Sequence, residues 1–126
     1  MVIYGKQKGE TNMNINCKKD GTTLLVTLNG DIDHHSAQDI SDGIARSFRH
    51  SHCKNIVIDF GDVNFMDSSG IGMLIGRYKE TEIFGGSLAA VAVSSELMKI
   101  FRISGLNKII DCYDNARLAL SALKGE

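Results

Sequence analysis

The feature that most limits the possible folds is a repeated alternation of short apolar runs with amphipathic helical patterns. Residues 55–60 (NIVIDF) and 87–93 (SLAAVAV) have the apolar character of strands buried on both faces of a sheet. Between these runs, Ile71, Leu74 and Ile75 recur at helical spacing. Strands that alternate with helices predict a mainly parallel sheet with right-handed crossovers.

The remaining elements extend this pattern at both ends of the chain. Residues 13–17 and 24–28 predict two strands joined by a turn that contains Gly21, so the sheet begins with a hairpin. Ser36 is the predicted N-cap of a first helix that ends near Arg49. Later elements are a third helix after Ser94 or Ser95, a short strand at 108–112 and a fourth helix after Asp114. We therefore predict an α/β domain with a mixed, mainly parallel sheet of about five strands and four helices.

Length and composition narrow the class of protein further. The chain has 126 residues, which suits a single domain, and its net charge of -1 gives no reason to expect nucleic acid or an acidic membrane as a partner. Residues 1–12 are polar and lack periodicity, so we predict a flexible N-terminal leader followed by a domain over 13–126. The longest apolar run, 88–93, is far too short to cross a bilayer. Three cysteines with no CxxC pair favour reduced thiols and a cytoplasmic location.

Signals for catalysis or metal binding are weak. Ser68 lacks the G-x-S-x-G context of a nucleophilic serine, and a nearby Asp33 with His34 or His35 does not make a triad by adjacency. The stretch at 50–53 (HSHC) has ligand-type side chains without the spacing of a zinc site. A phosphate-binding loop is also absent from the sequence. We expect no enzyme activity, metal or cofactor.

The most informative stretch is 65–72 (FMDSSGIG), at the predicted start of the second helix. Asp, Ser and Gly are favoured at helix N-caps, so capping alone would explain it. The same place also suits a modified hydroxyl, because a helix N-terminus can hold phosphate oxygens. Gly70 and Gly72 would keep the surface low around such a hydroxyl, and Met73 with Ile71 could form an exposed apolar patch beside it. The residues by themselves leave both interpretations open.

Several stretches of the chain resemble the anti-sigma factor antagonists of the STAS domain family, over about Met13 to Leu123. These stretches are LNGDIDHHSA (28–37), NIVIDF (55–60), VNFMDSSGIGMLIGRYK (63–79), GGSL (85–88) and ISGLNKIID (103–111). The DHH and GRYK segments favour the sporulation type over the general-stress type. The resemblance implies a STAS fold in which the helices pack mostly on one face of the sheet.

The resemblance also implies a function and a site. The unmodified protein would bind an anti-sigma factor with serine kinase activity and so release a sigma factor. Phosphorylation of Ser68 would switch this binding off, and a PP2C-type phosphatase would reverse it. The expected partner-binding residues surround Ser68 and the DHH loop; they are Asp33, His34, His35, Asp67, Ser69, Gly70, Ile71, Gly72 and Met73. The alternative is a non-switching STAS scaffold in a stress-signalling or transport complex.

Overall fold

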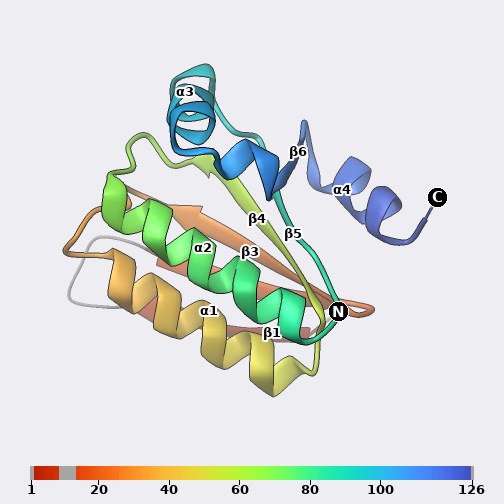
Figure 1. Ribbon diagram of the computed structural model, residues 1–126. Helices are drawn as coiled ribbons and strands as arrows, with labels where there is room; N and C mark the ends of the chain where they lie inside the picture. Colours follow the sequence, from red (N-terminus) through yellow and green to blue (C-terminus); the bar gives the residue numbers. More distant parts are fainter. Residues whose placement is uncertain (1, 9–13, 126) are drawn as a thin grey trace.

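The computed structural model describes residues 2–8 and 14–125, which form one six-stranded sheet and its flanking helices (Figure 1). The strands, which lie in the sheet in sequence order, are β1 (Val2–Lys8), β2 (Asn14–Asp20), β3 (Thr23–Asn29), β4 (Asn55–Asp62), β5 (Leu88–Val91) and β6 (Asp111–Tyr113). The helices are α1 (Ala37–Ser51), α2 (Ser68–Ile83), α3 (Ser95–Ser104), the short 3-10 helix η1 (Leu106–Lys108) and α4 (Ala116–Leu123).

The sheet is mixed, as the sequence predicts. β1, β2 and β3 pair antiparallel, whereas β3, β4, β5 and β6 pair parallel. The β2–β3 hairpin turns at Gly21, whose φ of 60° lies in the left-handed region that glycine adopts without strain. Because β3 and β4 run parallel, the segments that follow them lie together where these two strands end, at the edge of the sheet formed by the carboxyl ends of the strands.

The amino-terminal segment differs from its prediction. We predicted a flexible leader over residues 1–12, but Val2–Lys8 form β1, which pairs with β2 at the edge of the sheet. Residue 1 and residues 9–12 lie outside the described residues. An edge strand is held by backbone hydrogen bonds along its partner, so it needs no alternation of apolar residues, and the sequence pattern therefore gave no sign of it.

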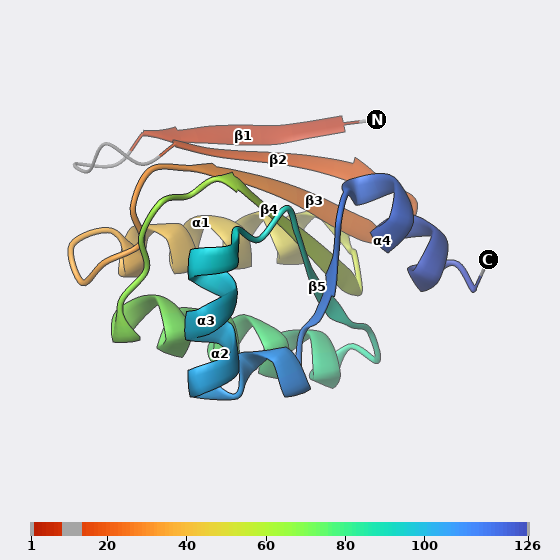
Figure 2. The same ribbon diagram turned by 90° about the horizontal axis from the view of Figure 1, so that it is seen from above.

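Most helices cover one face of the sheet, which confirms that part of the prediction. The large core joins the inward side chains of α1, α2 and α3, such as Ile44, Leu74 and Phe101, to one face of the strands. A smaller core on the other face joins Val57 of β4 to Ala119 of α4. Figure 2 shows α1, α2 and α3 together on one side of the strands. Residues 55–58 of β4 are buried on both faces because helices cover both.

The helices and the cysteines show two further features. Among the described residues, no helix combines the length and the apolar character needed to cross a membrane. Cys17, Cys53 and Cys112 are free thiols, and burial raises the pKa of Cys17 and of Cys112. A raised pKa favours the protonated form of both thiols.

Candidate functional site

The segments that precede α1 and α2 are tied together at one edge of the sheet. Ile32 and Met66 form an isolated parallel bridge, in which the Ile32 N–H donates to the Phe65 carbonyl at 2.9 Å and the Asp67 N–H donates to the Ile32 carbonyl at 3.1 Å. The Gly30 N–H donates to the Asp62 carbonyl at 3.1 Å. These bonds bring the DHH loop and the DSSG stretch side by side.

Before α1, Asp33 organises a tight turn. Its Oδ1 accepts hydrogen bonds from the backbone N–H groups of His35 at 2.9 Å and Ser36 at 3.1 Å. These bonds, first that from His35, hold the pKa of Asp33 below its ordinary value. Ser36 is buried, and its hydroxyl accepts from the Asp33 N–H and donates to the Asp31 carbonyl. The prediction that Ser36 caps α1 is correct for its position but wrong for its side chain, which makes no capping bond because the loop uses its hydroxyl.

The histidines of this loop face solvent. His34 and His35 are both exposed, and their rings lie 3.8 Å apart between centroids at an interplanar angle of 40°. The Asp33 carboxylate bonds to backbone N–H groups and to the Ser36 hydroxyl, which is geometry for a turn and not for a catalytic triad. The two histidine side chains are therefore accessible from the solvent and are not part of a catalytic arrangement.

Before α2, Asp67 is the N-cap. Its Oδ1 accepts a hydrogen bond from the Ser69 N–H at 2.8 Å, so the capping interpretation of the DSSG stretch is confirmed. Ser68 is the first residue of α2 and is exposed. Within the described part of the chain, the Ser68 hydroxyl has no hydrogen-bond partner. The cap is thus made without this hydroxyl, which stays available at the surface.

Gly70 is buried and lets α2 pack closely, whereas we predicted that it would lower the exposed surface. A Cβ at this position would lie 2.3 Å from Met66 Cγ and 2.9 Å from Ile32 Cγ2, well inside van der Waals contact. Glycine therefore lets the start of α2 sit directly on the bridge between Ile32 and Met66. Gly72, by contrast, is exposed, and a Cβ there would meet nothing within 4 Å. Only Gly72 lowers the outer surface as predicted.

The predicted apolar patch of Ile71 and Met73 is wrong for Met73. Its side chain is 6% exposed and belongs to the main core, and Ile71 is partly buried against the same core. Helix α2 turns a wider face inward than its strongest apolar repeat indicated, because α1 covers it from the side. The exposed apolar residue at this edge is instead Phe65, at 50%. Its signal in the sequence was a large apolar residue in a loop, outside any strand or helix repeat.

A hollow of about 360 Å³ lies between the first turns of α1 and α2. The lining combines predicted partner-binding residues with neighbours on α1; it consists of His34, Ala37, Gln38, Ser41, Ser69, Gly72 and Met73. The DHH loop and the start of α2 therefore share one surface. Metal binding gains no support here, because within residues 2–8 and 14–125 no cluster of His, Cys, Asp and Glu is arranged to hold an ion.

The sequence and the fold of this chain are similar to those of known proteins. A model of the STAS domain family matches residues 14–119, and the chain belongs to that family. An anti-sigma F factor antagonist from Paenibacillus polymyxa is 34% identical over 113 residues, which cover 90% of this chain and 97% of the relative.

Solved structures give the same likeness. The anti-sigma factor antagonist SpoIIAA in its unphosphorylated form matches with a TM-score of 0.77 and 26% identity, over 89% of this chain and 97% of that chain. The Bacillus cell fate determinant SpoIIAA in the phosphorylated form matches with a TM-score of 0.67 and 27% identity, over 86% of this chain and 97% of that chain. This chain is therefore similar to a protein that exists with and without a phosphate.

Proposed function

We propose that this protein is an anti-sigma factor antagonist that works as a phosphorylation switch. In its unmodified form it binds an anti-sigma factor and so frees a sigma factor. Phosphorylation of Ser68 by that anti-sigma factor, acting as a serine kinase with ATP, ends the binding. The chain itself has no catalytic role in this proposal, and a PP2C-type phosphatase resets the switch in the cytoplasm.

The observation that carries the proposal is the exposed Ser68 hydroxyl at the start of α2. Asp67 caps the helix through the Ser69 N–H, so the fold does not use the Ser68 hydroxyl. A kinase can reach this oxygen without unfolding any part of the domain. Relatives named as anti-sigma factor antagonists, and SpoIIAA structures in both phosphorylation states, support the assignment.

The switch acts through local charge. A phosphoserine carries about -1.5 to -2 charges at neutral pH. The positive end of the α2 dipole favours this charge, so the fold of the domain tolerates it. Asp31, Asp33 and Asp67 already surround this edge with carboxylates. A partner that packs against Ser68 would have to bury the added charge beside them, which weakens binding without any rearrangement of the domain.

Phosphorylation of Ser68 should weaken the binding of the anti-sigma factor strongly. A misplaced charge at an interface costs several kcal/mol, and a loss of about 4 kcal/mol weakens binding roughly a thousandfold. We expect Ser68→Ala to bind the anti-sigma factor as tightly as the unmodified protein, and Ser68→Asp to bind much more weakly. Calorimetric titration of each variant with that anti-sigma factor measures both.

A matched control separates the site from a general charge effect. Ser95 is also exposed and is also the first residue of a helix, α3. Ser95→Asp therefore adds the same charge in the same local setting at a different place. We expect Ser95→Asp to bind like the unmodified protein. Equal, tight binding of Ser68→Ala and Ser68→Asp would contradict the proposal.

The contact surface of this proposal is the edge formed by the DHH loop and the start of α2. Its exposed members are His34, His35 and Gly72, with Asp33, Asp67 and Ser69 partly exposed. Gly70 and Met73 act from beneath, because they are buried and hold α2 in place. Substitutions of His34 and His35, which are exposed and make no capping bond, should weaken partner binding without loss of stability, whereas substitutions of Gly70 and Met73 should lower stability.

A further inference from the structure

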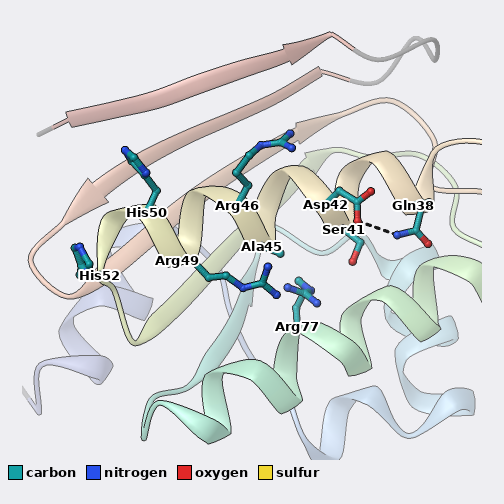
Figure 3. Close-up of a pocket in the computed structure, with 9 residues that line it drawn as sticks. All are labelled: Gln38, Ser41, Asp42, Ala45, Arg46, Arg49, His50, His52 and Arg77. Atoms are coloured by element: carbon teal, nitrogen blue, oxygen red, sulfur yellow. Dashed lines mark hydrogen bonds between the residues drawn. The ribbon is translucent and has the colours of Figure 1, made fainter.

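A basic groove runs along the exposed side of the α1–α2 pair, in a cavity of about 840 Å³ (Figure 3). Its basic lining residues are Arg46, Arg49, His50, His52 and Arg77. Figure 3 shows the Arg49 and Arg77 side chains pointing toward each other between the two helices. Among the described residues that line the cavity, Asp42 is the single acid, and it accepts a hydrogen bond from Gln38 at 2.8 Å. The groove is positive although the chain as a whole is slightly negative.

The charges in the groove are not balanced. Arg49 Nε lies 2.8 Å from Glu80 Oε2, and Arg77 bonds to the other oxygen of the same carboxylate. The Arg77 side chain is only 13% exposed, and its Nε is buried with no hydrogen-bond partner among the described residues. Two guanidinium groups thus share one carboxylate. Because a largely buried cation is costly unless it is well paired, a second carboxylate at this point would be stabilised.

The groove is long and changes character along its length. At one end it shares Gln38 and Ser41 with the hollow beside Ser69. At the other end it shares Arg49 and His52 with a third hollow of about 190 Å³.

The far end is apolar. Phe48, Phe84 and Cys53 help to line this third hollow, and Phe84 is 54% exposed. The rings of Phe48 and Phe84 meet edge to face with centroids 5.6 Å apart. A small anion would fill only the basic part of such a surface. A stretch of polypeptide that carries carboxylates and then an apolar side chain would match all of it.

We propose that this groove binds an acidic segment of a partner protein, which lies along α1. Its carboxylates pair with Arg49 and Arg77, and an apolar side chain of the segment packs beside Phe84. Arg46 adds positive charge from the outer side of α1. The proposal goes beyond the switch at Ser68. It does not depend on phosphorylation, because no residue of the DHH loop or of the DSSG stretch takes part in these contacts.

The test uses the full chain, labelled with ¹⁵N, and short synthetic peptides. One peptide alternates Glu and Ser and ends in Leu, a second has Gln in place of Glu, and inorganic phosphate is the third probe. We expect the acidic peptide to shift amide resonances along the C-terminal half of α1 and near Arg77. The Gln peptide should bind about tenfold more weakly or not at all.

A matched pair of variants locates the binding. Arg46→Glu with Arg49→Glu reverses two exposed charges in the groove, whereas Arg102→Glu with Arg117→Glu reverses two exposed charges on α3 and α4. We expect the first pair to weaken acidic-peptide binding at least tenfold, and the second to leave it unchanged. Equal binding by both pairs, equal binding of both peptides, or absence of shifts along α1 would overturn the proposal. Inorganic phosphate that binds as tightly as the acidic peptide would also overturn it, since the groove would then be a simple anion site.

Discussion

The starts of α1 and α2 are built alike but use their serines differently. In both, an aspartate follows one partner of the Ile32–Met66 bridge and accepts a hydrogen bond from the N–H two residues later, at 2.9 Å for Asp33 and 2.8 Å for Asp67. Before α1, the serine hydroxyl of Ser36 is buried and bonded within the loop. At α2, the hydroxyl of Ser68 is exposed and unused by the fold. At α2 the aspartate makes the capping bond, so the Ser68 hydroxyl has no structural task and is available for the phosphorylation that we propose.

The largest effect on stability should come from Gly70 of α2, with Gly72 as its contrast. Gly70→Ala would place a methyl group 2.3 Å from Met66 Cγ, so we expect it to lower the free energy of unfolding by about 1–3 kcal/mol. Gly72→Ala meets nothing within 4 Å and should raise it by about 0.5–1 kcal/mol, because alanine favours a helix. Urea denaturation of both variants measures this. Equal effects would mean that α2 does not rest on the bridge as described.

The two serines provide the next test. Ser36→Ala removes a buried hydroxyl and leaves the Asp33 N–H and the Asp31 carbonyl without it, so we expect a loss of about 1–2 kcal/mol. Ser68→Ala should change the free energy of unfolding by less than about 0.5 kcal/mol, as for an exposed position. The same denaturation experiment compares them. A large loss for Ser68→Ala would show that its hydroxyl has a structural role and would break the comparison.

The cap of α2 should have a moderate effect. Asp67→Ala removes the acceptor for the Ser69 N–H, and we expect it to cost about 1 kcal/mol of stability. Asp67→Asn retains an acceptor oxygen and should recover most of that loss. If Asp67→Asn were as destabilised as Asp67→Ala, the charge near the helix dipole would matter more than the hydrogen bond.

The smallest effect should be the pH dependence due to Asp33. The pKa of this carboxyl is lowered in the folded state from an ordinary value of about 3.9, chiefly by the His35 N–H. Its charged form therefore adds stability that is present above about pH 4 and is lost as the pH falls through the lowered pKa. We expect the difference in unfolding free energy between the wild type and Asp33→Asn to shrink over that range. A difference that stays constant with pH would show that the ionised Asp33 carboxylate does not stabilise the fold.

Much of this fold follows from local patterns, while the site depends on tertiary contacts. The apolar run of β4 and the helical repeat of α2 placed both elements correctly. A strand buried on both faces needs a continuous apolar run, and a helix buried on one face needs apolar residues at helical spacing. The pattern could not reveal β1, which pairs through its backbone, or the inward turn of Met73, which depends on where α1 packs. We predicted that the small size of Gly70 keeps the surface low around the hydroxyl. Only the Ile32–Met66 bridge beneath it explains why no larger residue fits.

The measurement that tests the central claim most directly is site-resolved mass spectrometry after incubation with the anti-sigma kinase and ATP. Ser68→Ala and Ser69→Ala serve as paired controls, because Ser69 differs from Ser68 in lining the hollow between the helices. We predict one phosphate, on Ser68, that is absent only in Ser68→Ala. Phosphate on Ser69, or none with a kinase that modifies a known antagonist, would contradict the assignment of Ser68 as the switch.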